Sequence, residues 1–144
     1  MNKACVDANV ILRFLLNDPL PMAQEAATLF QAVANGQLIL LVDDLIVAEM
    51  VWVLKSFYKQ DVVTIATTLR DFLLQDGIET ADKPTVLHAL TLFETKNVDF
   101  VDALLAARMM NKGMATVFSF DRHFDRLPLI QQITPGDVAS FVAS

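Results

Sequence analysis

Apolar residues follow two different spacings along the chain, and these spacings predict its secondary structure. Short segments that suit strands occur at residues 3–6, 38–42, 78–80 and 116–118, and the second of them consists of apolar residues only. The unbroken run 38–42 indicates a strand covered on both faces. Longer segments have helical spacing: residues 10–16, 22–33, 45–58, 61–75, 82–97 and 100–111. Strands that alternate with helices predict an α/β fold with a mainly parallel central sheet and right-handed crossovers.

Two acidic residues follow predicted strands at the place where parallel sheets usually hold their sites. Asp7 comes after the run 3–6, and Asp121 follows the run 116–118. The carboxyl ends of parallel strands meet at one edge of a sheet, and ligands of open α/β sheets bind beyond that edge. We therefore expect both carboxylates at the same edge.

Two further acids lie inside apolar helical segments. Glu49 has apolar residues three and four positions away on both sides, so we expect that it cannot easily reach water. Asp102 has Leu105 and Ala106 at the same spacing. An ionised carboxylate is costly to bury without a partner. Four such acids in one place would need cations to balance their charge.

The chemistry of these side chains points to a divalent metal as the counter-charge. Lys55 is the only Lys or Arg within six residues of Glu49, and it lies about 120° away around the helix. Carboxylates favour hard cations such as Mg²⁺ or Mn²⁺, whereas zinc favours Cys and His, of which the chain has one and two. Such an ion can activate water and stabilise charge on a phosphodiester. We therefore predict hydrolysis of a nucleic-acid backbone.

The charge balance limits how the chain can hold nucleic acid. Eleven basic and seventeen acidic residues give a net charge of -6, which disfavours a broad basic face that binds by counterion release. Three basic residues near the acids in sequence are candidate ligands of RNA phosphates, and ordinary solvated positions explain each equally well: Arg108, Lys112 and Arg122. Trp52 and the ten Phe residues have helical spacing that favours core positions over base stacking.

Composition also predicts the setting of the protein. Hydrophobic residues make up 54% of the chain, which excludes disorder and leaves apolar surface for a partner. The single Cys5 cannot form an intramolecular disulfide, and the sequence contains no apolar run of signal-peptide or membrane-helix length. The length of 144 residues suits one domain and not two. We expect a soluble cytoplasmic protein with a single domain over residues 1–144.

Each acid also has a structural interpretation. Asp7 can cap the helix that follows it, and Asp99 with Asp102 has the spacing of a capping box. Asp121 can close an Asx-turn. Glu49 lies in the middle of its helix and has no cap to serve. The functional hypothesis therefore rests on the set of four rather than on any single acid.

Four short motifs contain these acids: Val6–Leu12, Ala48–Leu54, Asp99–Ala106 and Ser119–Phe124. In order, spacing and total chain length they resemble the motifs of the PIN-domain ribonucleases, particularly the VapC-type toxins of type II toxin–antitoxin systems. The resemblance implies a three-layer α/β/α fold with a central, mainly parallel sheet. It also implies a Mg²⁺ or Mn²⁺ site that cuts RNA with metal-activated water and leaves 3′-hydroxyl and 5′-phosphate ends.

The resemblance also assigns residues and partners. The four family acids fall on Asp7, Glu49, Asp102 and Asp121, as catalytic residues and metal ligands. Asp99, one helical turn before Asp102, is a further metal-ligand candidate. Two residues match supporting polar positions of the site: Asn9 and Ser119. The family pattern implies a cognate antitoxin and a homodimer, and the apolar segments 10–16 and 19–21 are the surface we predict for such a partner.

Two other functions remain open at this point. A receiver-like phosphoacceptor domain has a similar length and an acid pair that binds Mg²⁺, but it needs a Lys after a later strand, where this chain has Arg122. A non-catalytic PIN-like module would bind RNA and leave it intact. Acetyl phosphate would label only the receiver, and Asp7→Asn would change nothing in the binding module.

Overall fold

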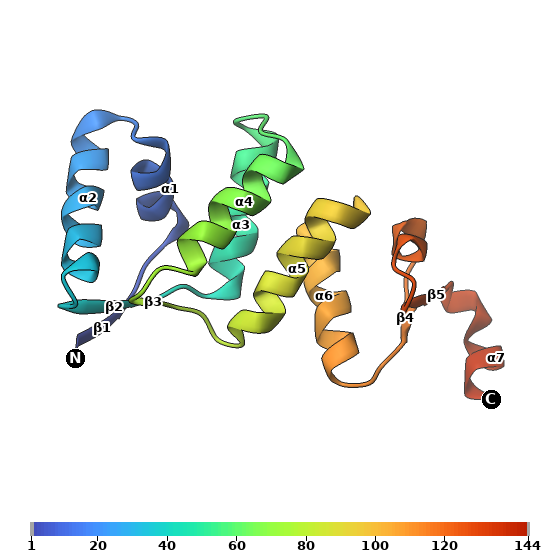
Figure 1. The fold of residues 1–144 in the computed structure, drawn as a ribbon. Helices are drawn as coiled ribbons and strands as arrows, with labels where there is room; N and C mark the ends of the chain where they lie inside the picture. Colours follow the sequence, from blue (N-terminus) through green and yellow to red (C-terminus); the bar gives the residue numbers. More distant parts are fainter. Residues whose placement is uncertain (1, 144) are drawn as a thin grey trace. The chain divides into compact units, whose positions relative to one another are not determined.

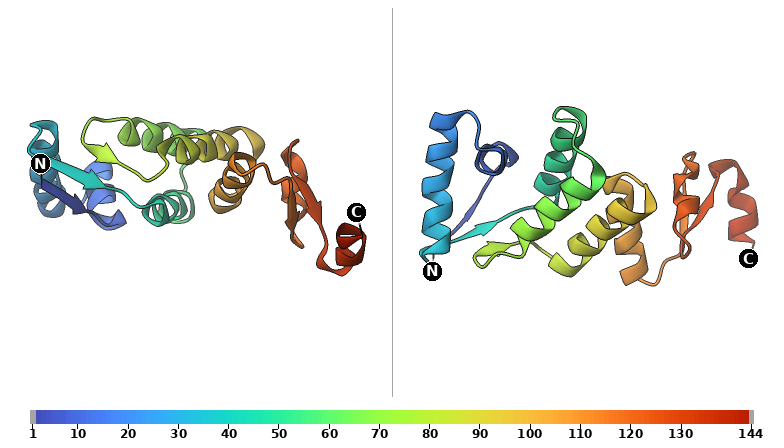
Figure 2. Two further views of the ribbon diagram at one scale, coloured as in Figure 1. Left: turned by 90° about the horizontal axis from the view of Figure 1, so that it is seen from below. Right: turned by 45° about the horizontal axis from the view of Figure 1, so that its top comes forward.

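The computed structural model describes residues 2–143 and separates them into two compact units. The first unit ends at Lys83 and the second begins at Pro84. Figure 1 shows the order of their elements along the chain, and Figure 2 shows the same ribbon from two further sides. The prediction of one domain over the whole chain stays a prediction, and each unit is described by itself.

A parallel sheet of three strands forms the base of the first unit. The strands lie in the order β1-β2-β3 and are β1 (Asn2–Cys5), β2 (Leu38–Leu41) and β3 (Ile78–Glu79). Ala4 is paired with Leu40, and Leu40 in turn with Ile78. β2 is the middle strand, yet only Leu40 is buried and the other residues are half-buried. The strand is therefore covered less fully than the unbroken apolar run predicts.

Four helices complete the first unit: α1 (Ala8–Leu16), α2 (Leu20–Ala34), α3 (Asp44–Ser56) and α4 (Val62–Leu73). The helices and strands of this unit start and end within three residues of the predicted boundaries. Asp43 and Asp61 fix two helix starts, because their carboxylates accept hydrogen bonds from the backbone N–H of Leu45 (2.9 Å) and Thr64 (2.8 Å). These caps were visible in the sequence as acids placed just before apolar helical spacing.

Aromatic and aliphatic side chains fill the core of the first unit. Phe30 of α2 stacks on Phe14 at 4.4 Å between ring centroids and meets Phe72 of α4 edge-on at 5.7 Å. Gly77 precedes β3 with φ +86°, and a Cβ there would lie 2.6 Å from Cγ1 of Val33. Glycine is therefore required where the chain passes from α4 into the sheet.

The second unit combines helices with a two-stranded parallel sheet. Its elements are α5 (Lys83–Lys96, which starts at the boundary), α6 (Phe100–Asn111), β4 (Thr116–Phe118), η1 (Arg122–Arg126), β5 (Gln131–Ile133), η2 (Pro135–Asp137) and α7 (Val138–Val142). Phe93 and Phe100 meet edge-on at 6.5 Å, and Asn111 donates a side-chain hydrogen bond to the buried hydroxyl of Thr85. These contacts join α5 to α6.

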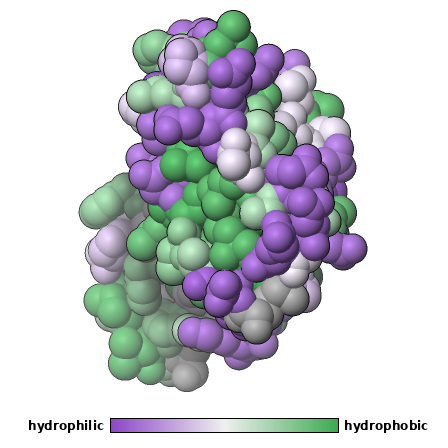
Figure 3. All heavy atoms as spheres, turned by 90° about the vertical axis from the view of Figure 1, so that its left-hand side faces the viewer, coloured by the Kyte–Doolittle hydropathy of each residue, from purple (hydrophilic) through white to green (hydrophobic). Residues whose placement is uncertain are grey.

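Several large apolar side chains stay at the surface. Figure 3 shows one face of the molecule, on which apolar residues gather between polar ones. On α3, Leu45 is 74% and Trp52 67% exposed. The prediction of core positions is therefore wrong for Trp52 and for four of the Phe residues, which are also exposed: Phe57, Phe118, Phe120 and Phe141. Leu20 and Met22 of α2 are also exposed. Among residues 2–143, the structure has no helix that combines the length and hydropathy needed to cross a membrane.

Candidate active site

Asp7 lies beyond the carboxyl end of β1, where parallel sheets carry their sites. Its carboxylate accepts a hydrogen bond from the backbone N–H of Val10 at 3.0 Å and so caps α1, as the structural interpretation predicts. The side chain is exposed and lines a cavity of about 860 Å³ at the ends of the three strands. One carboxylate oxygen thus serves the helix, and the acid as a whole faces open space.

Two acids that the sequence analysis did not assign to the site line the same cavity. Asp43 lies two residues after the end of β2, as Asp7 does after β1, and Glu79 is the last residue of β3, level with Cys5 in the register of the sheet. Asp43 caps α3, and Glu79 forms an exposed ion pair with Lys3 at 3.6 Å. The signal for Asp43 was available in the sequence, because it directly follows the apolar run 38–42, whereas Glu79 lies inside the predicted strand 78–80.

The exposure of Glu49 contradicts one expectation drawn from the sequence. The side chain is exposed, whereas Val47, Met50 and Leu54 turn the buried side of α3 inward. The expectation that Glu49 cannot reach water is wrong, because the apolar Trp52 one turn away is itself at the surface. Burial therefore does not argue for a counter-ion at Glu49, and its assignment depends on the motif around it.

Three carboxylates of the second unit, Asp99, Asp102 and Asp121, influence one another electrostatically. Asp102, in the first turn of α6, is half-buried, and burial raises the pKa of its carboxyl above the ordinary value. The negative charges of Asp121 and Asp99 raise the same pKa further, and the nearby His123 lowers it. A carboxyl whose charged form is opposed by burial and by two other carboxylates is a position at which a cation is favoured.

A tight turn after β4 fixes the position of Asp121. Its carboxylate accepts the backbone N–H of His123 at 2.8 Å, which is the Asx-turn that the structural interpretation predicts. The hydroxyl of Ser119 accepts the backbone N–H of Asp121 at 2.9 Å, and Nδ1 of His123 lies 3.3 Å from the Asp121 carboxylate. Ser119 is in turn tied to β5 through its backbone N–H, which donates to Ile133 at 3.0 Å.

The four predicted acids belong to two different units, and each pair is described within its own unit. Asp7 and Glu49 belong to the first unit, and Asp102 and Asp121 to the second. Within residues 2–143, no group of three or more His, Cys, Asp or Glu side chains is arranged to hold a metal ion. The joint site of four acids therefore stays a prediction. Asp99 occupies the N-cap position of α6 but makes no capping hydrogen bond through its side chain.

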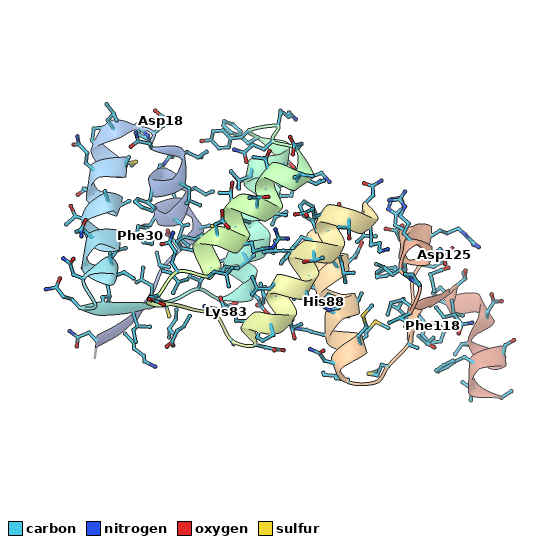
Figure 4. The ribbon with its side chains drawn as sticks, viewed as in Figure 1. Asp18, Phe30, Lys83, His88, Phe118 and Asp125 are labelled. Atoms are coloured by element: carbon cyan, nitrogen blue, oxygen red, sulfur yellow. The ribbon has the colours of Figure 1, made fainter. Side chains whose placement is uncertain are left out.

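The predicted substrate ligands differ in their surroundings. Arg108 lies in the last turn of α6 and Lys112 is its C-cap residue, so the two lie one turn apart as predicted. Arg122 forms an exposed ion pair with Asp125 at 3.8 Å on η1, where Figure 4 labels Asp125. Asn9, a predicted supporting residue, is exposed and lines a small cavity together with Glu49. This shared cavity links two of the predicted site residues in the first unit.

Comparison with known families decides what kind of fold carries these acids. The chain matches the PIN domain family over residues 4–129, a range that includes all four acids. The protein belongs to the PIN-domain family. The match, together with the parallel strands and the seven α-helices within residues 2–143, confirms the predicted α/β class with its PIN-like arrangement. No curated protein matches the sequence significantly.

Membership in the PIN-domain family implies a general function. PIN domains are typically nucleases, which are hydrolases, and they generally depend on divalent metals. The carboxylates around Asp102 agree with that dependence, because hard divalent ions favour oxygen ligands. The match gives no support to the receiver-like alternative.

Proposed function

We propose that this PIN domain is a Mg²⁺- or Mn²⁺-dependent endoribonuclease and the toxin of a type II toxin–antitoxin pair. The observation that supports the nuclease proposal is the half-buried Asp102, whose pKa is raised by burial and then by the negative charges of Asp121 and Asp99. In a family of nucleases, a cluster of acids that repel one another is best explained by a cation that relieves the repulsion.

Four acids would hold the ion, with Asp99 as a fifth candidate: Asp7, Glu49, Asp102 and Asp121. A divalent ion held there supplies the positive charge that activates water and stabilises a phosphodiester under attack. Asp7 and Asp121 are oriented by their own backbone hydrogen bonds, to Val10 and His123, before any ion arrives. Ser119 maintains the turn at Asp121, which agrees with its proposed supporting role.

The RNA would be held by basic residues that lie outside the acid cluster. Arg108 and Lys112 extend from the end of α6, and Arg122 follows Asp121 directly. Their positive charges act locally, although the net charge of the chain is -6. Phosphate contacts of this kind position a substrate and do not select its sequence.

A cleavage assay tests the nuclease proposal. Labelled single-stranded RNA should be cut in Mn²⁺ or Mg²⁺ and should remain intact in EDTA, and the products should carry 3′-hydroxyl and 5′-phosphate ends. Asp7→Asn and Asp102→Asn should each remove most of the activity. Asp137→Asn is the matched control, since Asp137 is an exposed acid of the second unit without a capping hydrogen bond. Full activity in EDTA would refute the metal role.

The toxin proposal has its own tests. Expression should arrest growth, Asp102→Asn should relieve the arrest, and the product of a small adjacent gene should neutralise the wild type. Exposed Leu20 and Met22 at the start of α2 support a partner surface at the predicted segment 19–21, whereas Ile11 and Leu12 of the predicted segment 10–16 are buried in the core. A homodimer should scatter light with twice the monomer mass of 16.0 kDa. Intact RNA that nevertheless binds the wild type would favour the non-catalytic module.

A further inference from the structure

A small cavity opens on the first unit between α1 and the end of α3. Its volume is about 210 Å³, which is below the size of most pockets for drug-sized ligands. The residues that line it come from three places, namely α1 (Ala8, Asn9, Leu12 and Arg13), α3 (Glu49 and Val53) and the turn after α3 (Phe57 and Tyr58). We call this the α1–α3 cavity. It contains an acid of the proposed metal site, a cation and two aromatic rings.

Arg13 provides a partly fixed positive charge in the α1–α3 cavity. Its Nη1 donates to the backbone carbonyl of Asp18 at 3.3 Å, close to the turn that Figure 4 marks with the Asp18 label. Its Nε is buried and has no hydrogen-bond partner within the described chain. Glu49 lines the same cavity, yet no ion pair joins these two side chains among residues 2–143. The guanidinium therefore keeps donor capacity for an anionic group.

The aromatic wall of the cavity consists of Phe57 and Tyr58. Their ring centroids are 5.0 Å apart with an angle of 72° between the planes, and Phe57 is 73% exposed. Large exposed rings are unfavourable in water unless a partner covers them. Because both rings follow the end of α3, they stand beside the side chains of that helix that reach the cavity.

The charge of this stretch is opposite to that of the whole chain. Between residues 50 and 60 the sequence has two basic residues, Lys55 and Lys59, and no acid, although the net charge of the chain is -6. Both lysines are exposed and lie on either side of Phe57 and Tyr58 in the sequence. Basic residues that alternate with aromatic ones favour single-stranded nucleic acid, because phosphates pair with the cations and bases stack on the rings.

We propose that the α1–α3 cavity binds one nucleotide of a single-stranded RNA, with the base against Phe57 and Tyr58 and a phosphate toward Arg13. This inference rests on the proposed ribonuclease function and deepens it, since Glu49, an acid of the proposed metal site, lines the same cavity. An acidic peptide would use the cations but would leave the two aromatic rings without a stacking partner. The cavity volume suits one flat base with its phosphate.

Binding measured without cleavage tests the proposal. A fluorescein-labelled short single-stranded RNA of mixed sequence is titrated with the full chain in EDTA, and anisotropy gives Kd. The double variant Phe57→Leu/Tyr58→Leu should raise Kd about fivefold or more, since base stacking on an aromatic ring has an effect of this size. Trp52→Leu is the matched control, because Trp52 is a 67% exposed aromatic residue of α3 that does not line the cavity. It should change Kd by less than about twofold.

A series of RNAs with one abasic nucleotide locates the contact. The loss caused by Phe57→Leu/Tyr58→Leu should disappear when the missing base is the one that stacks, and should persist at every other position. Circular dichroism confirms that the variants are folded. An unchanged Kd for the aromatic variant, or an equal loss for Trp52→Leu, overturns the proposal.

The cleavage assay separates this inference from the function on which it rests. If the wild type binds RNA but leaves it intact with Mn²⁺, and the aromatic variant loses binding, the cavity is a nucleotide site and the ribonuclease proposal fails. If the aromatic variant binds and cuts RNA like the wild type, the ribonuclease proposal stands and the cavity inference fails. A wild type that binds no RNA overturns both.

Discussion

Neutralising Asp102 should make the protein more stable and less active at the same time. The carboxyl of Asp102 is opposed by its burial and by the charges of Asp121 and Asp99, which together raise its pKa. Asp102→Asn removes this opposition and keeps the size of the side chain. We therefore expect the variant to unfold at a higher temperature than the wild type in EDTA at pH 7.

The size of the effect follows from the exposure of the group. Asp102 is only half-buried, so water screens its repulsion from the other carboxylates. Interactions between partly exposed charges contribute about 0.2–1 kcal/mol, and we expect Asp102→Asn to stabilise by about 0.5–1 kcal/mol. For a chain of this length, that gain raises Tm by about 1–4 °C. Differential scanning calorimetry resolves a change of this size.

The pH dependence of Tm provides a separate test of whether ionised Asp102 destabilises the fold. A carboxyl with a raised pKa in the folded state destabilises the fold when ionised, and the penalty is lost as pH falls through that pKa toward the unfolded value of about 3.9. The difference in Tm between Asp102→Asn and the wild type should therefore be largest near neutral pH. It should shrink in acid, where Asp102 becomes protonated.

Metal addition should reverse the order of stability. Mn²⁺ at about ten times its dissociation constant stabilises the wild type by about 1.4 kcal/mol through mass action, and Asp102→Asn should gain much less. Asp137→Asn, the exposed acid of the same unit, should behave like the wild type in both conditions. A Tm for Asp102→Asn at or below that of the wild type in EDTA would show that the three acids do not oppose one another.

Two further predictions concern the first unit. The hydrogen bond that Asp61 accepts from the backbone N–H of Thr64 holds the pKa of the Asp61 carboxyl below its ordinary value. Asp61→Ala should therefore lower Tm at neutral pH. In circular dichroism melts, the difference in Tm between this variant and the wild type should vanish as pH falls through that lowered pKa. A difference independent of pH would contradict the cap. Gly77→Ala should destabilise the protein by about 2 kcal/mol or more in urea unfolding, because the positive φ and the side chain of Val33 both oppose a Cβ. Gly113 also has a positive φ but has open space around it, so Gly113→Ala should destabilise the protein by about 1 kcal/mol. Equal costs would show that the contact with Val33 is unimportant.

The sequence predicts secondary structure better than it predicts which residues meet. Asp43 and Asp61 signal their helices because an N-cap depends only on the next three residues. β5 was missed because it begins with Gln131 and Gln132, which form no apolar run. Glu49 was misjudged because helical spacing shows which residues share a face and does not show whether that face is covered.

In the candidate site, too, local features could be predicted from the sequence and long-range contacts could not. The turn of Asp121 and the cap of Asp7 are local, and both follow from the sequence as structural interpretations. The electrostatic effect of Asp121 on Asp102 is not local, since the two residues belong to elements that are separate in the sequence. The lining of the α1–α3 cavity joins α1 to α3 and was likewise not visible from spacing alone. The sequence signal for it was the pattern Lys55-Ser56-Phe57-Tyr58-Lys59, which was assigned no role.

The backbone contacts of Asp7 and Asp121 have a consequence for how such a protein could lose its activity. Each acid already holds a backbone N–H, at Val10 and His123, through an oxygen that an asparagine would also possess. A change to asparagine at either position therefore removes the negative charge but leaves the local turn in place. Relatives that have become inactive would be expected to keep the ordinary shape of the domain, and their loss would show only in the identity of these two residues.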